Sequence, residues 1–148
     1  HDPAEGSDAP LLNVRDSEHV TDRDWEIFPQ GLYDILMRLA GEYPFSPLFV
    51  TENGASYPDS PAADGEVHDP KRIDYMYRHL ESIYRAMADG VPVKGYFYWT
   101  LMDNFEWAFG TSSRFGLAYT DFTTQKRILK DSGRWFARVT RANALVTP

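Results

Sequence analysis

The sequence predicts an α/β fold in which parallel strands alternate with helices. Two short apolar runs, residues 48–51 and 93–99, have the length and bulk of strands buried on both faces. Between them, residues 70–88 keep a helical apolar period for about four turns. Because a strand, a helix and a second strand form a right-handed crossover, we expect the two strands to be parallel and to end at one edge of the sheet.

Two parallel strands are too few for a closed domain. A parallel sheet needs both faces covered, and each open edge exposes unpaired backbone groups. The pattern corresponds to about a quarter of an eight-stranded (β/α) barrel, a fold that usually needs ~250 residues. The 148 residues are therefore expected to be part of something larger.

Three helices are expected. The first begins at Pro29 and is ended by Gly41 and Pro44. The second follows Asp69 as its N-cap, and the third is capped by Asp131 or Ser132. The apolar residues expected on their buried faces are Leu32, Ile35, Leu36, Leu39 and Tyr43 in the first, Ile73, Met76, Tyr77, Leu80, Ile83, Tyr84 and Met87 in the second, and Trp135, Phe136, Val139 and Ala142 in the third.

The remaining segments are expected to be irregular or short. Residues 1–24 are polar and rich in proline, residues 53–66 form a loop, and residues 115–119 form a short strand that turns at 121–123. Asn53 and Gly54 supply turn chemistry, because both residue types tolerate positive φ. Gly95 suits a point of close backbone approach within the second strand.

Composition excludes several classes of protein. Hydrophobic content is 43%, aromatic content is 15%, and the formal net charge is −7. The negative charge argues against nucleic acid and anionic membranes as partners. No cysteine is present, so disulfides and thiolate metal sites are excluded. We see no signal peptide or membrane span and expect a cytoplasmic location.

Glu52 is the first candidate for catalysis. It follows the buried run 48–51 directly, and catalytic groups of βα barrels lie at the carboxyl ends of the strands. The alternative is an ordinary surface salt bridge at the end of a strand. These residues alone leave both interpretations open.

The loop after the second strand supplies further candidates. Residues 100–110 are dense in aromatic and acidic side chains, which suits a site where sugar C–H faces stack and hydroxyls pair with carboxylates. Glu106, Trp99 and Trp107 are the candidates for sugar binding. The alternatives are a solvated charge for Glu106, barrel core for Trp99 and loop packing for Trp107.

A carboxylate beside such a loop favours glycoside hydrolysis. Retaining glycosidases use one carboxylate as nucleophile and a second as acid/base ~5–5.5 Å away. Glu52 can take the nucleophile's role and form a glycosyl-enzyme intermediate. The four histidines lack metal-like spacing, and neither a phosphate loop nor a serine-histidine-aspartate set is present, so no cofactor is expected.

Four motifs make the chain similar to a known family. They are WEIFPQGL at 25–32, VTENG at 50–54, YWTLMDNFEW at 98–107 and RFGL at 114–117. With them the chain closely resembles the C-terminal part of family 1 glycoside hydrolases, the β-glucosidase family. The resemblance covers nearly the whole chain from residue 21 onward.

The resemblance implies a fold and a set of site residues. The fold is a (β/α)₈ barrel to which this chain supplies the seventh and eighth strands with their helices. Residues 1–148 would form one partial domain, with 1–24 as a loop arm and 25–148 as the last βα units. Glu52 would be the nucleophile, Glu106 would bind the sugar's 4- and 6-hydroxyls, and Trp107 the 3-hydroxyl. Trp99 matches another position of the glycone site, and Phe115 matches its wall.

The resemblance also indicates the substrate. A related branch of the family cleaves 6-phospho-sugars and replaces the Glu-Trp pair with residues that hold phosphate. Glu106 remains here, and its charge would repel a phosphate. We therefore expect β-glucosides or short cello-oligosaccharides as substrates, with β-galactosides or β-fucosides as side substrates.

The family's acid/base motif, Thr-(Phe/Leu)-Asn-Glu-Pro, does not occur in this sequence. The expected function is thus the C-terminal segment of a retaining β-glucosidase that works with an N-terminal segment of the same barrel, present as a second chain. The alternative is a non-catalytic fragment or sugar-binding remnant. A decaying remnant need not keep Glu52, Trp99, Glu106 and Trp107 together, which favours the first interpretation.

Overall fold

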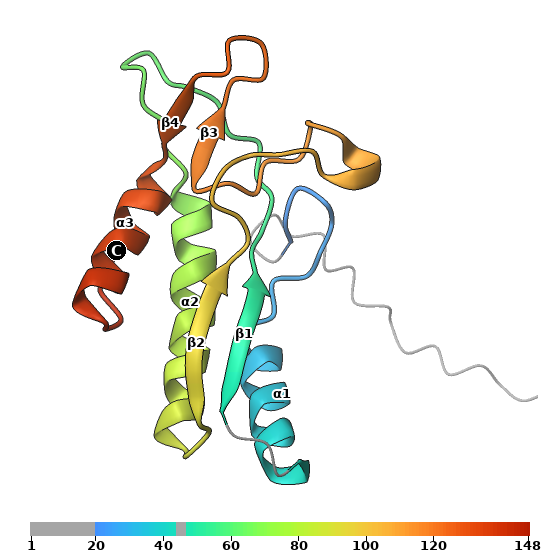
Figure 1. Ribbon diagram of the computed structural model, residues 1–148, viewed down its shortest axis with the longest axis vertical. Helices are drawn as coiled ribbons and strands as arrows, with labels where there is room; N and C mark the ends of the chain where they lie inside the picture. The colour runs from blue at the N-terminus through green and yellow to red at the C-terminus, as the bar shows by residue number, and fades with distance from the viewer. Residues whose placement is uncertain (1–19, 44–46) are drawn as a thin grey trace, which may run out of the picture.

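The computed structural model describes residues 20–43 and 47–148 (Figure 1). Its elements follow in the order α1 (Pro29–Glu42), β1 (Leu48–Asn53), α2 (Pro70–Ala88), β2 (Val93–Tyr98), η1 (Trp107–Phe109), β3 (Ala118–Thr120), β4 (Arg127–Leu129) and α3 (Asp131–Ala142). Most of the expected arm, residues 1–19, and the expected stop at Pro44 lie outside the described residues. Within the described ranges no helix is long and apolar enough to cross a membrane.

Strands β1 and β2 pair in parallel, as the crossover pattern predicts. Leu48 pairs with Val93 at the start of the strands and Asn53 pairs with Tyr98 at their end. The register shifts between Val50 and Asn53, which is the stretch that contains Glu52. The two strands therefore present their carboxyl ends at one edge, where the loops after them begin.

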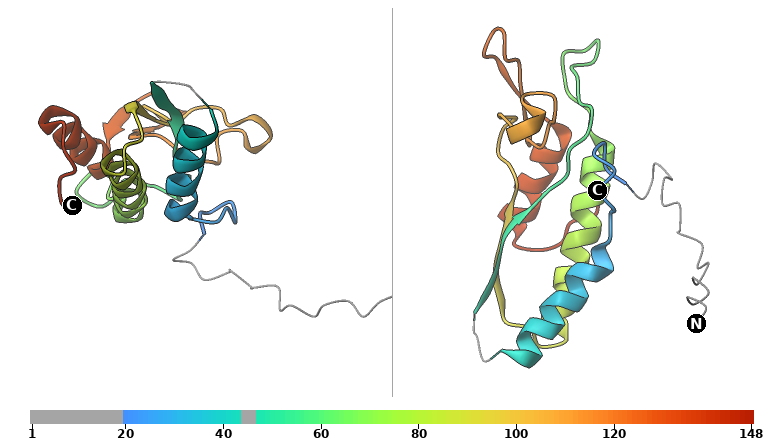
Figure 2. Two further views of the ribbon diagram at one scale, coloured as in Figure 1. Left: turned by 90° about the horizontal axis from the view of Figure 1, so that it is seen from below. Right: turned by 90° about the vertical axis from the view of Figure 1, so that its right-hand side faces the viewer.

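Helices α1 and α2 cover one face of this sheet, and no described element covers the other (Figure 2). Leu48 and Val50 pack on the helix side, whereas Phe49 is 53% and Phe97 is 58% exposed. The prediction that residues 48–51 are buried on both faces is therefore wrong for the described chain. The apolar composition is that of a two-sided strand, but one side has no packing partner here.

Two apolar clusters hold the layers together. One joins α1 and α2 to the strands, and its buried members are Leu36, Ile83, Ala86, Val91 and Val93. The other lies at the carboxyl end of the strands and joins α2 to α3, with Met76 fully buried and Trp135 2% exposed. Burial of these side chains stabilises the fold by about 25 cal/mol per Å² of apolar surface removed from water.

Some residues of the predicted helix stripes are exposed instead. Ile35 and Tyr43 of the first stripe, Tyr84 and Met87 of the second, and Ala142 of the third all lie at the surface. The periodicity correctly located the helices, but it overestimated the width of their buried faces. Each helix meets its neighbours along a narrower strip than the apolar pattern suggests.

The caps of α2 and α3 also differ from prediction. Asp69 occupies the N-cap position of α2, but its side chain makes no capping bond there. Its carboxylate instead accepts hydrogen bonds from the backbone N and the Oγ of Ser132, at 2.8 and 2.5 Å, in the first turn of α3. The N-cap of α3 is Lys130, not Asp131 or Ser132. A residue 63 positions away thus satisfies a helix terminus that local capping was expected to satisfy.

Candidate active site

Glu52 and Trp99 lie at neighbouring strand ends. Glu52 is the penultimate residue of β1 and is exposed, while the backbone N of Trp99, one residue beyond β2, donates to the carbonyl O of Asn53 at 3.0 Å. Among the described residues Glu52 forms no hydrogen bond or ion pair, so the surface salt bridge that was the alternative interpretation has no partner here. The carboxylate is free to face a ligand at this edge.

The side chain of Asn53 is held from both sides. Its Nδ2 donates to the Tyr75 hydroxyl at 3.1 Å, and its Oδ1 accepts from the Tyr96 hydroxyl at 2.9 Å. Burial raises the pKa of Tyr75 to about 12 and raises the pKa of Tyr96 well above its usual value, so both hydroxyls stay protonated. The residue directly after Glu52 is therefore fixed to α2 and β2.

Gly54 is needed for close approach and not for turn conformation. A Cβ on Gly54 would lie 1.8 Å from the carbonyl O of Trp99, which no side chain permits. Neither Asn53 nor Gly54 has a positive φ, so the turn chemistry expected of this pair was wrong. At Gly95 the close neighbour is a side chain and not backbone as predicted, because a Cβ there would lie 2.6 Å from the Phe49 ring of the paired strand.

Glu106 and Trp107 lie in a projecting loop. The loop containing η1 extends beyond the carboxyl ends of β1 and β2 (Figure 1). The backbone N of Glu106 donates to the carbonyl O of Gly110 at 2.7 Å, which closes the tip on itself. Trp107 has φ +45° and is 83% exposed, so its ring covers nothing in the described chain. The alternative role for Trp107 was packing within the loop, but its side chain has no packing partner among residues 20–43 and 47–148.

Phe115 differs from the other four predicted site residues. It is only 4% exposed, and its ring centroid lies 5.9 Å from that of Trp25. The structure therefore brings Glu52, Trp99 and the loop of the 106–107 pair to one edge, whereas Phe115 is buried at the return end of that loop. Trp99 is about one-third exposed at this edge.

Sequence reasoning missed a buried ionic network under these loops. Arg72, in the first turn of α2, pairs with Asp59 and Asp69 and also donates to the carbonyl oxygens of Ala55 and Arg114. Burial opposes its charge, but Tyr98 and Asp59 outweigh this effect and keep the pKa of the guanidinium above its usual value. Arg72 thereby ties the loop after β1 to the loop after β2.

Lys130 extends the network to a third carboxylate. Its side chain is fully buried, and its Nζ donates to Asp59 at 2.5 Å and to Asp103 at 3.0 Å. Asp103 also accepts from Arg114 at 2.7 Å. Burial, followed by repulsion from Arg72, lowers the pKa of Lys130, although the two carboxylates act in the opposite direction. No local pattern signals this network, because its partners lie up to 71 residues apart.

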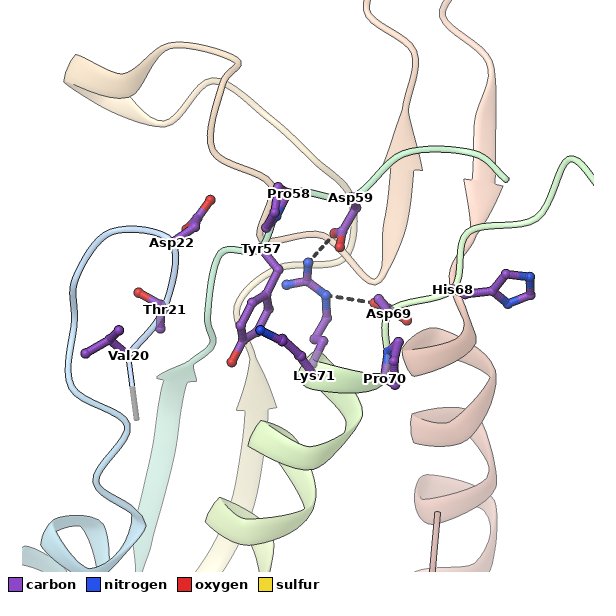
Figure 3. Close-up of a pocket in the computed structure, with 11 residues that line it drawn as sticks. Val20, Thr21, Asp22, Tyr57, Pro58, Asp59, His68, Asp69, Pro70 and Lys71 are labelled. Carbon is purple, nitrogen blue, oxygen red and sulfur yellow. Dashed lines mark hydrogen bonds and ion pairs between the residues drawn. The ribbon is translucent and has the colours of Figure 1, made fainter. Parts of the chain in front are cut away.

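A cavity of about 440 Å³ lies at the start of α2 (Figure 3). Tyr57, Pro58 and Lys71 line it, with Asp59 and Asp69 joined by dashed lines to the guanidinium between them. None of the five predicted site residues lines this cavity. The cavity is therefore distinct from the candidate active site, and Asp59 and Asp69 in its lining already pair with Arg72.

His68 lies at the rim of that cavity and bridges two carboxylates. Its Nδ1 lies 2.6 Å from Asp131 and its Nε2 lies 3.1 Å from Asp64. The hydrogen bond with Asp131, followed by that with Asp64, raises the pKa of the His68 imidazole. The imidazolium form therefore links the 59–66 loop to the start of α3.

Comparisons with known proteins place this geometry in a family. The sequence model described as "Glycosyl hydrolase family 1" matches residues 5–145. A "1,4-beta-D-glucan glucohydrolase" of Thermotoga neapolitana is 53% identical over 121 residues, which are 82% of this chain and 27% of that protein. A "6-phospho-beta-galactosidase" of Clostridium acetobutylicum is 48% identical over 127 residues, 85% of this chain and 27% of that protein.

A solved structure agrees with the sequence comparisons. The family 1 β-glucosidase from Thermotoga maritima matches with a TM-score of 0.84 and 50% identity, covering 86% of this chain and 29% of that chain. This chain thus spans less than a third of the length of these relatives. It belongs to glycoside hydrolase family 1 and corresponds to a part of that family's (β/α)₈ barrel.

Proposed function

We propose that this chain is the segment of a retaining β-glucosidase that carries the nucleophile, Glu52, and part of the glycone site. The observation that carries the proposal is the position of Glu52. It is exposed, without an ion-pair partner in the described chain, and lies at the same strand edge as Trp99 and the loop with Glu106 and Trp107. In βα barrels this edge is where catalysis takes place.

In the proposed reaction the Glu52 carboxylate attacks the anomeric carbon of the glycoside. The bond from that carbon to the leaving oxygen breaks, and a glutamic acid from the N-terminal segment of the barrel protonates the leaving group. Water, deprotonated by the same residue, then attacks the glycosyl-enzyme from the opposite face and releases Glu52. The clamp on Asn53 limits the freedom of the backbone that carries the nucleophile.

The glycone-side residues favour an unphosphorylated β-glucoside. Glu106 offers acceptor oxygens for sugar hydroxyls, and the Trp99 and Trp107 rings offer apolar faces. Relatives of similar identity bear names from both branches, a "Bifunctional beta-D-glucosidase/beta-D-fucosidase" and a "6-phospho-beta-galactosidase" among them, so identity alone does not choose the substrate. The negative charge of Glu106 would repel a 6-phosphate and therefore disfavours a phosphorylated substrate.

The bare face of the sheet supports the need for the rest of the barrel. Phe49 and Phe97 expose more than half of their surface on that face, and the outer edges of β1 and β2 are unpaired in the described chain. Such a face and such edges are the surfaces that the remaining strands of a barrel would cover. We therefore include an N-terminal segment, on the same or a second polypeptide, as the partner.

The test uses the full barrel that contains this segment and an aryl β-glucoside. Glu52→Gln is expected to lower kcat on the order of 10⁴-fold, the scale seen when a nucleophile is removed. Glu81→Gln, an exposed glutamate of α2, is the matched control and should keep full activity. In Glu52→Ala, added azide should restore aglycone release and give an α-glucosyl azide, because it attacks from the side where Glu52 lay. Wild-type-like activity in Glu52→Gln would refute the assignment.

A further inference from the structure

Asp103 is buried at the base of the loop that carries Glu106 and Trp107. It lies five residues after the end of β2 and is 2% exposed, with a fully buried side chain. Its backbone N donates to the carbonyl O of Ala118 at 3.0 Å. A buried carboxylate normally requires several donors, so its surroundings indicate what it holds in place.

Four donors meet the two oxygens of this carboxylate. Oδ1 accepts from the backbone N of Gly116 at 2.9 Å and from Lys130 Nζ at 3.0 Å. Oδ2 accepts from Arg114 Nη1 at 2.7 Å and from the backbone N of Thr120 at 3.3 Å. All the acceptor positions of a carboxylate are thus used. Arg114 and Gly116 lie on the return side of the loop, whereas Thr120 belongs to β3 and Lys130 is the N-cap of α3.

The loop is held by hydrogen bonds and ion pairs at Asp103 and has few contacts with the described chain beyond it. Residue 103 begins the loop and residues 114–116 end it, so the carboxylate closes its base. The tip, which contains η1, is closed by its own backbone, and its contacts with the rest of the described chain are few: Arg23 lies 4.4 Å from the centre of the Phe109 ring, and its Nη2 donates to Ser112 Oγ. The direction in which the tip leaves the sheet is therefore determined at the base.

We propose that Asp103 is a positioning residue that sets where Glu106 and Trp107 meet the sugar, an inference that rests on the proposed function. It touches neither the substrate nor Glu52 and acts through the loop. An amide in its place would direct an NH₂ group at two of the four donors, so the base of the loop would have to shift. Misplacing a binding group by about 1 Å can cost ~10²-fold in rate, which makes the effect measurable.

The experiment compares Asp103→Asn with Asp69→Asn in the full barrel. Asp69 is an equally buried carboxylate that joins α2 to α3 and makes no bond of its own to the loop. Its partner Arg72 also donates to the carbonyl O of Arg114, so Asp69→Asn controls for loosening the network without touching the Asp103 carboxylate. Each variant is assayed on an aryl β-glucoside and on the aryl β-xyloside, which lacks the 6-hydroxymethyl group. Asp103→Asn should lower kcat/KM on the glucoside by ~10²-fold and on the xyloside by less, because the xyloside keeps the 3- and 4-hydroxyl contacts but has no 6-hydroxyl contact with Glu106 to lose. Asp69→Asn should leave the ratio of the two unchanged.

Two results would overturn the proposal. One is an equal loss on both sugars in Asp103→Asn, which would indicate a purely structural role, and the other is the same ratio change in Asp69→Asn. Where Asp103→Asn does not fold, Arg114→Met decides, since it keeps the carboxylate of Asp103 and removes the guanidinium that donates to its Oδ2 at 2.7 Å. An unchanged ratio in that variant also contradicts the proposal. Failure of the proposed function would appear separately, as full activity in Glu52→Gln.

Discussion

Replacing Lys130 by methionine tests the buried network most directly. Lys130, Asp59 and Asp103 have side-chain exposures of 0%, 4% and 0%, so solvent screens none of these charges. In the intact network three cations face three carboxylates; in Lys130→Met one buried negative charge remains in excess. Methionine keeps the volume and shape of the chain, so the change isolates the ammonium group.

The expected cost is about 3–5 kcal/mol of folding free energy, the range for removing one partner of a buried ion pair. Burial, together with repulsion from Arg72, lowers the pKa of Lys130 in spite of its two carboxylates. We therefore expect the ion pairs mainly to offset desolvation. The loss on mutation comes from the carboxylates left behind and not from the strength of the pairs themselves.

The assay monitors the thermal unfolding of the full barrel by circular dichroism. Lys126→Met, at an exposed lysine, is the control. Lys130→Met should lower Tm by several degrees relative to the control. The double variant with Asp59→Asn should show a coupling of about 1–3 kcal/mol, because it removes the excess negative charge. A Lys130→Met protein as stable as the Lys126→Met control would refute the reasoning.

Three further predictions use the same unfolding assay. Gly54→Ala should be strongly destabilising, since its Cβ would meet Trp99 O at 1.8 Å, and a near-normal Tm would contradict the close approach. Met76→Ala should cost about 2–5 kcal/mol through a buried cavity, whereas exposed Met87→Ala should cost little; equal effects would contradict the assigned core. The raised pKa of His68 means that its contribution to stability is present below about pH 6.5 and is lost as pH rises through the raised value. His68→Gln should flatten the dependence of Tm on pH over that window, and an unchanged curve would contradict the bridge to its two carboxylates.

The sequence alone determined where the regular elements lie and which motif carries the chemistry. Helical periods of apolar residues depend on local geometry, so the three helices and the two parallel strands could be located from the pattern. Glu52 could be placed at a strand end for the same reason, because an apolar run that stops at a carboxylate followed by Asn-Gly is a local signal. The family resemblance through four motifs is likewise a property of the linear sequence and is confirmed.

The tertiary structure alone decided how these parts are held. Asp69 caps α3 and not α2, and Lys130 joins Asp59 to Asp103 across 71 and 27 residues, so no window of the sequence could contain either interaction. The bare face around Phe49 and the narrow buried strips of the helices also depend on which neighbours are present. Local patterns report backbone propensity and amphipathicity, whereas burial and charge pairing depend on contacts between distant segments.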